Sequence, residues 1–261
     1  MPYKCLTVSI EDGVATITLD RPEAANAINL DLARDLTDVA IACEHDPSVR
    51  AVLMTGAGPM FCAGGDVKTF ASAGDMPALL KEITTYLHAG ISRLARMNAP
   101  VVMAVNGTAA GGGMSLACAG DFVLAADTAR FTMAYTRIGL APDGSSSYFL
   151  PRRIGIARTR ELMILSPVLS AAQALEWGLI DRVIPAAELM TSARALALEL
   201  ASGPTRAYGE VKRLLLDTFG NGLETQMELE SRAIAAMGAT ADGAEGVRAF
   251  VAKTKARFTG A

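Results

Sequence analysis

The 261-residue chain has only two histidines and four cysteines, and this scarcity excludes several kinds of site. His45 and His88 are too few for a zinc site with several histidine ligands. The cysteines form no CxxC pair and lie in apolar surroundings, which favours buried free thiols in a reducing compartment. We therefore expect no metal site and a cytoplasmic location.

Excess charge and long apolar runs are also absent. The formal net charge is −3 at pH 7, so electrostatics gives no reason to expect nucleic acid or an anionic membrane as partner. No apolar run is long enough to span a membrane, and the N-terminus lacks an apolar stretch of signal-peptide type. Apolar residues make up 51% of the chain and aromatic residues 5%, which is typical of an Ala-rich soluble α/β protein.

The order of predicted elements divides the chain into an alternating body and a helical tail. Two β-rich runs around Glu11-Asp12-Gly13 predict a hairpin, and Asn29 is a plausible cap for the amphipathic helix that follows. Residues 70–77 have the composition of a mobile surface connection. From residue 186 onward the pattern predicts only helices. The main predicted elements are strands at 4–10, 14–19, 49–55, 101–105, 122–126 and 130–133, and helices at 30–45, 77–97, 148–166, 171–177, 186–201, 205–219, 223–238 and 242–257.

Two glycine-rich turns each follow a predicted buried strand. One is NGTAAGGGMSLACAGD at 106–121, and the other is FCAGGD at 61–66. A strand that enters such a turn at the start of a helix leaves backbone N–H groups free, and these can hold an anion or a developing oxyanion. Neither turn contains the GxGxxG or GK[ST] signature of a nucleotide-binding loop. The alternative is that the glycines only allow a helix to pack closely on a sheet.

These two turns, with four further segments, resemble the crotonase, or enoyl-CoA hydratase/isomerase, superfamily. The segments are LDRPEAANAIN (19–29), FTMAYTRIGLAPDGSSSYFLPRRIG (131–155), ALEWGLIDRVIP (174–185) and EGVRAFVAKTKARF (245–258). The resemblance covers essentially the whole chain in the right order. It implies an α/β fold, the ClpP/crotonase-like spiral of ββα units. It also implies an acyl-CoA-binding core at 1–200 and a helical region at 201–261 that builds trimers, often paired into hexamers.

The resemblance also implies a binding site for an acyl-CoA thioester, with no cofactor other than the coenzyme A of the substrate. The backbone N–H groups of Gly65 and Gly112 are expected to hold the thioester oxygen. Lys253 matches a lysine that reaches the CoA phosphates of a neighbouring subunit, although it is equally well explained as an ordinary solvated lysine. The positions expected to cradle CoA are Ala24, Ala25, Ala27, Ala63 and Asp66.

The residues that decide the reaction differ from those of typical enoyl-CoA hydratases. The resemblance places Ser115 and Tyr135 where those hydratases carry two glutamates, so ordinary hydration is poorly supported. One acidic residue, Asp143, remains in the expected loop. This loop resembles that of 1,2-epoxyphenylacetyl-CoA isomerases and some enoyl-CoA delta isomerases. It also resembles that of 4-chlorobenzoyl-CoA dehalogenase, in which the matching residues are a nucleophilic aspartate, an aromatic donor at Tyr135 and a base at His88.

The leading hypothesis is therefore an enoyl-CoA isomerase in which Asp143 removes and returns a proton. One alternative is a hydratase in which Tyr135 or Ser115 helps Asp143 to hold water. Another is hydrolysis, with Asp143 as nucleophile and His88 as base, and a fourth is an inactive CoA-binding relative. The residues also have non-catalytic interpretations. Asp143 could cap the helix that begins near Ser145, His88 could be an ordinary helix-face residue, and Tyr135 could simply line a pocket.

Overall fold

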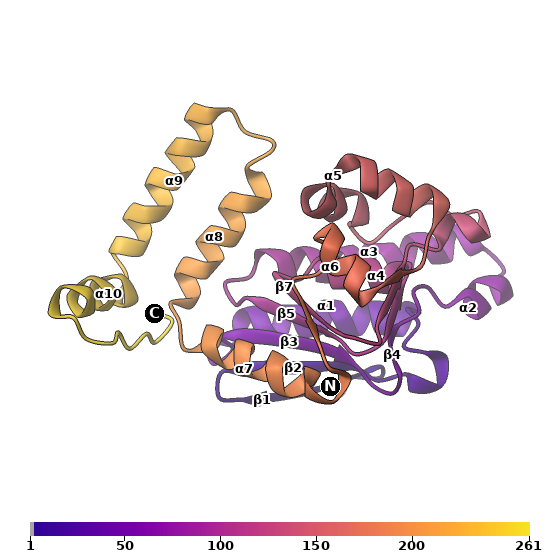
Figure 1. The fold of residues 1–261 in the computed structure, drawn as a ribbon, viewed down its shortest axis with the longest axis horizontal. Coiled ribbons are helices and arrows are strands. Elements are labelled where there is room, and N and C mark those ends of the chain that lie inside the picture. The colour runs from indigo at the N-terminus through magenta and orange to yellow at the C-terminus, as the bar shows by residue number, and fades with distance from the viewer. Residues whose placement is uncertain (1–2) are drawn as a thin grey trace.

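The computed structural model describes residues 3–261, which form two β-sheets with helices around them (Figure 1). The larger sheet has the strand order β1-β2-β3-β5-β7-β10, and the smaller has the order β4-β6-β8-β9. All neighbours are parallel except the pairs β1–β2 and β8–β9. The strands are β1 (Leu6–Glu11), β2 (Val14–Leu19), β3 (Ala51–Gly56), β4 (Met60–Cys62), β5 (Val101–Val105), β6 (Thr108–Ala110), β7 (Phe122–Ala126), β8 (Arg130–Thr132), β9 (Leu169–Ser170) and β10 (Arg182–Ile184).

The helices lie between and after these strands. Three short 3-10 helices are η1 (Pro22–Ala24), η2 (Tyr135–Ile138) and η3 (Ala186–Glu188). The α-helices are α1 (Leu30–His45), α2 (Val67–Ser72), α3 (Met76–Arg96), α4 (Gly112–Cys118), α5 (Ser146–Leu165), α6 (Ala171–Trp177), α7 (Leu189–Ala201), α8 (Thr205–Asp217), α9 (Leu223–Gly238) and α10 (Ala241–Ala252).

A repeated unit generates the two sheets. A strand of the larger sheet, a strand of the smaller sheet and a helix follow one another as β3-β4-α2, as β5-β6-α4 and, with a 3-10 helix, as β7-β8-η2. Each unit pairs in parallel with the preceding one in both sheets. The turns between the smaller sheet and the helices consequently lie beside one another, which is how the two glycine-rich segments are brought together.

The core lies between the larger sheet and its helices. Every residue of β3 and β5 is buried, as a parallel sheet covered on both faces requires. Helices α1 and α3 pack against each other closely, because a Cβ on Gly90 would lie 3.1 Å from the backbone of Leu36. The Thr37 hydroxyl also donates to the carbonyl of Tyr86 at 2.6 Å. The free cysteines, Cys5, Cys43, Cys62 and Cys118, are all buried, as predicted.

Several local predictions are confirmed and two are wrong. Strands β1 and β2 form the predicted hairpin, and Asn29 caps α1 by accepting the N–H of Leu32 at 2.9 Å. The prediction of a mobile connection at 70–77 is wrong, because Phe70 is a buried residue of α2 and α3 begins at Met76. The predicted helix at 242–257 ends earlier, at Ala252, where Lys253 adopts a left-handed conformation with φ +57°.

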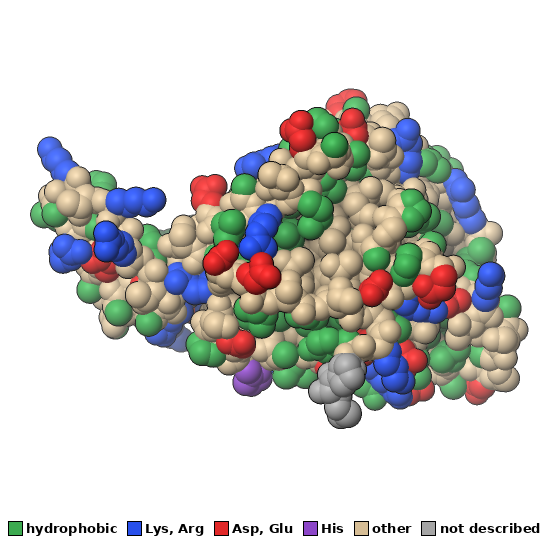
Figure 2. Space-filling view, turned by 90° about the horizontal axis from the view of Figure 1, so that it is seen from below, with side chains coloured by type: hydrophobic (Ala, Val, Ile, Leu, Met, Phe, Trp, Pro, Cys, Tyr) green, Lys and Arg blue, Asp and Glu red, His purple; other side chains and the backbone are tan. Residues whose placement is uncertain are grey.

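Helices α8 and α9 extend away from the body, with α10 at their outer end (Figure 1). A buried lysine attaches α8 to the body: Lys212 contacts Asp121 at 2.8 Å and donates to the carbonyls of Leu94 and Ala99, each at 3.0 Å. In Figure 2 the extension is narrower than the body and carries several Lys and Arg side chains at its far end. Within residues 3–261, no helix has both the length and the apolar character that crossing a membrane requires. Exposed apolar residues on or beside the three helices are Val211, Leu215, Phe219, Leu223, Met227, Ile234, Val247, Phe250 and Val251.

Candidate active site

The two glycine-rich turns are in contact. Gly64 has φ +95°, and a Cβ there would lie 2.7 Å from the carbonyl oxygen of Ala110 and 3.2 Å from the nitrogen of Gly112. Gly111, with φ +48°, is the N-cap residue of α4. Only glycine accepts both the backbone conformation and the close approach at Gly64. The two turns that carry Gly65 and Gly112 are therefore side by side in the fold.

Each turn presents one free backbone donor to the same cavity. Gly112 is the first residue of α4, so its N–H has no acceptor within the helix. Ile28 pairs with the backbone on both sides of the Gly65 N–H. The Ile28 N–H donates to the carbonyl of Gly64 at 2.7 Å, and the Asp66 N–H donates to the carbonyl of Ile28 at 3.0 Å. Within residues 3–261, neither glycine N–H donates to a protein acceptor, and both glycines line the cavity. Two such donors can hold an oxyanion between them.

The third glycine of the triplet has a packing role. A Cβ on Gly113 would lie 2.3 Å from the carbonyl oxygen of Cys62, so this glycine allows α4 to pack directly on β4. The interpretation that the glycines serve helix packing is correct for Gly113, whereas Gly112 faces the cavity.

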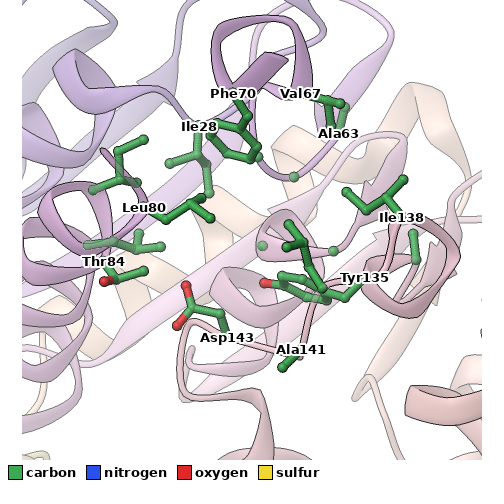
Figure 3. Close-up of a pocket in the computed structure, with 18 residues that line it drawn as sticks. Ile28, Ala63, Val67, Phe70, Leu80, Thr84, Tyr135, Ile138, Ala141 and Asp143 are labelled. Atoms are coloured by element: carbon green, nitrogen blue, oxygen red, sulfur yellow. The ribbon is translucent and has the colours of Figure 1, made fainter. Parts of the chain in front are cut away.

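The cavity has a volume of about 340 Å³ and a mainly apolar lining. Helix α3 and residues near α2 form one wall, and the segment from Ala134 to Asp143 forms the other. In Figure 3 the Asp143 carboxylate and the Tyr135 ring lie across the cavity from Phe70 and Ile28. Asp143 is the one charged residue among the described lining residues. The others are Ile28, Ala63, Gly64, Gly65, Val67, Phe70, Leu80, Ile83, Thr84, Leu87, Gly111, Gly112, Ala134, Tyr135, Ile138, Leu140 and Ala141.

The structure pairs Asp143 with His88. The two side chains come from the loop before α5 and from α3, and His88 Nε2 lies 2.6 Å from Asp143 Oδ1. The interpretation of Asp143 as a helix cap is wrong, because the N-cap of α5 is Ser145 and it is the Asp143 carbonyl that accepts the Ser146 hydroxyl, at 2.9 Å. His88 is half exposed, as expected for a helix-face residue, but its ring also reaches the cavity carboxylate.

A neutral hydrogen-bonded pair occupies the two positions at which the resemblance expects glutamates. The hydroxyls of Ser115 and Tyr135 lie 3.3 Å apart, and Ser115 also donates to the carbonyl of Gly111 at 3.2 Å. Burial raises the pKa of the Tyr135 hydroxyl well above its usual value, despite the Ser115 contact. Tyr135 is therefore a protonated hydrogen-bond donor at neutral pH. Gly144 packs against Ser115, since a Cβ on Gly144 would lie 2.9 Å from the Cβ of Ser115.

Of the predicted CoA-binding positions, Ala63 lines the cavity, Ala27 and Asp66 are next in the chain to the lining residues Ile28 and Gly65, and Lys253 lies elsewhere. Ala63 lines the cavity, and its N–H donates to the carbonyl of Ala25 at 3.0 Å, so the two loops are joined. Ala24 ends η1 and Ala27 lies one residue before Ile28. Lys253 lies instead at the end of α10, away from this chain's cavity, so its role toward a neighbouring subunit stays a prediction.

Sequence reasoning did not single out Arg21, although it lies in the quoted segment LDRPEAANAIN. Its guanidinium contacts Asp66 at 3.1 Å and donates to the carbonyl of Ala27. The basic residue two positions after a strand and directly before Pro22 was the available signal, but its partners follow only from the fold.

In this fold, strands of the two sheets follow one another in pairs, and two glycine N–H groups converge on an apolar cavity. These features define the crotonase class of proteins. The chain belongs to the enoyl-CoA hydratase/isomerase family, whose sequence model matches residues 9–261. The protein is thus an acyl-CoA-processing enzyme of the crotonase superfamily.

Proteins that are named for different activities are similar to this chain in sequence or in fold. The chain is 41% identical to the 1,2-epoxyphenylacetyl-CoA isomerase of Escherichia coli (strain K12), over 96% of this chain and 97% of that protein. It is 35% identical to the 4-chlorobenzoyl coenzyme A dehalogenase-2 of an Arthrobacter species, over 86% of this chain and 82% of that protein. The crystal structure of an enoyl-CoA hydratase from Polaromonas sp. JS666 matches with a TM-score of 0.92 and 31% identity, covering 97% of this chain and 99% of that one.

Proposed function

We propose that the protein is an isomerase that moves a double bond in an unsaturated acyl-CoA thioester. The observation that carries this proposal is the single carboxylate, Asp143, in an apolar cavity that also presents the N–H groups of Gly65 and Gly112. One carboxylate is sufficient to take a proton from one carbon and return it to another. The similarity to a CoA-thioester isomerase supports the same reaction class.

The proposed reaction balances as two proton transfers. Asp143 removes a proton from C2 of a 3-enoyl-CoA, and the C2–H electron pair moves into the C1–C2 bond while charge develops on the thioester oxygen. The N–H groups of Gly65 and Gly112 stabilise that oxygen in the resulting dienolate. The protonated Asp143 then delivers its proton to C4, and the double bond lies between C2 and C3. The substrate loses no electrons overall, so the reaction requires no redox cofactor.

Replacing Asp143 with asparagine tests this assignment. Asp143→Asn preserves the side-chain shape but cannot accept the proton, and general acid–base groups of this kind typically contribute about 10²- to 10⁴-fold to the rate. We expect kcat to fall by that factor while the affinity for the CoA thioester is retained. Asp31→Asn, at a surface residue paired with Lys4, serves as the matched control. Unchanged turnover in Asp143→Asn would rule out Asp143 as the proton-transfer group.

The contact between His88 and Asp143 favours a second candidate function, hydrolysis. Here an Asp143 oxygen attacks the acyl carbon and displaces the CoA thiolate, or attacks an aryl carbon and displaces its leaving group as an anion. His88 then activates the water that cleaves the resulting anhydride or aryl ester. The similarity to a dehalogenase is in line with this chemistry. In His88→Ala this covalent intermediate would accumulate, and mass spectrometry of the peptide containing Asp143 would detect it. The isomerase proposal predicts that this peptide keeps its unmodified mass.

The remaining alternatives differ in their products. A hydratase would convert a 2-enoyl-CoA into the 3-hydroxyacyl thioester, with water held by Asp143 and by the hydroxyl of Tyr135 or Ser115. An inactive relative would bind acyl-CoA without exchanging the proton on C2 for deuterium. A panel of 2-enoyl, 3-enoyl and aromatic CoA thioesters followed by NMR in D₂O separates these outcomes from isomerisation.

We also propose that the protein assembles into a homotrimer or a dimer of trimers. The support is the set of exposed apolar side chains on the extended helices α8 to α10, which a monomer would leave in contact with water. Sedimentation velocity at several concentrations tests this, and a concentration-independent monomer would contradict it.

A further inference from the structure

Arg21 is a mostly buried arginine for which the reaction proposed above has no role. Its side chain is 16% exposed and lies between the loop that follows β2 and the turn that precedes α2. One guanidinium nitrogen donates to the carbonyl of Ala27, and another contacts the Asp66 carboxylate at 3.1 Å. Asp66 is also the N-cap residue of α2, so the arginine links the two loops that supply Ile28 and Gly65 to the cavity lining.

A continuous chain of hydrogen bonds leads from this arginine to the donor of Gly65. The carbonyl of Ala27, which accepts from Arg21, belongs to the same peptide group as the N–H of Ile28. That N–H donates to the carbonyl of Gly64 at 2.7 Å, and this carbonyl shares a peptide group with the N–H of Gly65. In a planar trans peptide the C=O and N–H point in opposite directions. The N–H of Gly65 is therefore directed away from Ile28 by the same bond that holds the Gly64 carbonyl.

The surrounding contacts make this arrangement rigid. Asn26 is fully buried, accepts the N–H of Arg21 at 2.9 Å, and donates to the carbonyls of Ala57 and Met60 at 2.9 and 2.8 Å. The other side of Gly65 is fixed as well, since the N–H of Asp66 donates to the carbonyl of Ile28 at 3.0 Å. Each bond in such a chain polarises the next, and a charged donor at the first position strengthens the effect.

We propose that Arg21 is a positioning residue that orients and polarises the Gly65 N–H through the two peptide groups 27–28 and 64–65. This inference rests on the proposed role of Gly65 as a donor to the thioester oxygen. The guanidinium charge draws electron density from the Ala27 carbonyl, which makes Ile28 N–H a stronger donor and, through the Gly64 carbonyl, makes Gly65 N–H a stronger donor in turn. Asp66 keeps the guanidinium in place.

The test compares Arg21→Met and Arg21→Lys with the surface control Arg34→Met, whose arginine pairs with Glu82. The readout is the C=O stretching frequency of a bound cinnamoyl-CoA labelled with ¹³C at the carbonyl, measured by isotope-edited infrared difference spectroscopy. Hydrogen bonding to the oxygen lowers this frequency relative to free thioester. We expect a clearly smaller lowering in Arg21→Met, an intermediate value in Arg21→Lys, and no change in Arg34→Met.

Kinetics on a 3-enoyl-CoA give the second readout. We expect kcat to fall about 10- to 100-fold in Arg21→Met with KM within a few-fold, which is less than the 10²- to 10³-fold loss on removing an oxyanion donor outright. If Arg21→Met does not fold, Arg21→Lys, which retains the charge, decides the question by the same two readouts. An unchanged carbonyl frequency in the folded variants would overturn the proposal. A raised KM with unchanged kcat would also overturn it, because that result indicates direct contact of Arg21 with CoA.

These outcomes separate the positioning role from the proposed reaction. The carbonyl frequency is measured on a bound thioester whether or not the enzyme isomerises it. A frequency that depends on Arg21 in a protein without isomerase activity would remove only the proposed reaction. A frequency independent of Arg21 in an active isomerase would remove only the positioning role.

Discussion

The oxyanion site can be tested at Gly112 by removing the backbone N–H of that residue. Gly112 is the first residue of α4, a helical position at which proline is tolerated because no helical hydrogen bond is lost. The preceding Gly111 has no Cβ to clash with the proline ring. Gly112→Pro therefore deletes the donor and places the ring Cδ on the nitrogen, whereas Gly112→Ala keeps the donor and controls for the added Cβ. In both variants the added Cβ would lie 3.1 Å from Ile28 Cδ1 and 3.4 Å from the Tyr135 hydroxyl.

The expected difference between these two variants follows from the strength of one oxyanion donor. Removing such a donor typically costs about 3–4 kcal/mol of transition-state stabilisation, or about 10²- to 10³-fold in kcat. We expect Gly112→Pro to be slower than Gly112→Ala by this factor when formation of the conjugated 2-enoyl thioester is followed by ultraviolet absorbance. Thermal melting of both variants is the control that checks whether they are folded. Equal kcat values in two folded variants would refute the role of the Gly112 N–H.

Three further predictions concern stability and selectivity. Lys212→Met leaves the partly buried Asp121 carboxylate without its ammonium partner, although the Val101 N–H still donates to it. The free energy of unfolding in urea should therefore fall by about 3 kcal/mol, the low end for a buried pair, and a loss under 1 kcal/mol would contradict the anchoring role of this pair. Burial opposes ionisation of Asp66, but the Thr69 N–H and Arg21 hold its pKa below the ordinary 3.8. Ionised Asp66 therefore adds stability that is present above pH 3.8 and lost as the pH falls through the lower folded-state pKa. Asp66→Asn should cost about 1 kcal/mol near pH 6 and progressively less below pH 3.8 in urea titrations, and a pH-independent cost would contradict this. Asp143 is the one charged group of the described cavity lining, so an acyl group with a terminal carboxylate would place a second anion beside it. We expect kcat/KM for such a thioester to be at least about 100-fold lower than for the methyl-terminated thioester of equal length. Equal kcat/KM values would contradict this prediction.

Most helices were predictable because they carry long periodic patterns, and the central strands of the larger sheet because they are continuous apolar runs. The smaller sheet was not, apart from β8, because β4 and β6 have three residues each and β9 has two, too few to show a period. In the sequence β4 and β6 are indistinguishable from parts of the glycine-rich turns. The end of α10 was equally hidden, because the segment after Ala252 contains no nearby proline or glycine to stop the helix.

The candidate site was predictable to the level of its residues but not its contacts. The glycine turns and Asp143 are visible in the sequence, and the resemblance assigns them to one site. The contact between His88 and Asp143 joins residues 55 positions apart, and the chain from Arg21 to Gly65 runs through backbone groups that any residue possesses. Such contacts depend on how α3 and the loops pack, so no local pattern encodes them.

The most direct test of the proposed function is the identity of the product formed from a 3-enoyl-CoA. The wild-type enzyme, incubated with this substrate in D₂O and followed by ¹H NMR, should form the 2-enoyl-CoA. In Asp143→Asn the same product should form about 10²- to 10⁴-fold more slowly. A 3-hydroxyacyl thioester or free acid as the first product, or an equal rate in Asp143→Asn, would contradict the assignment of Asp143 as the proton carrier of an isomerase.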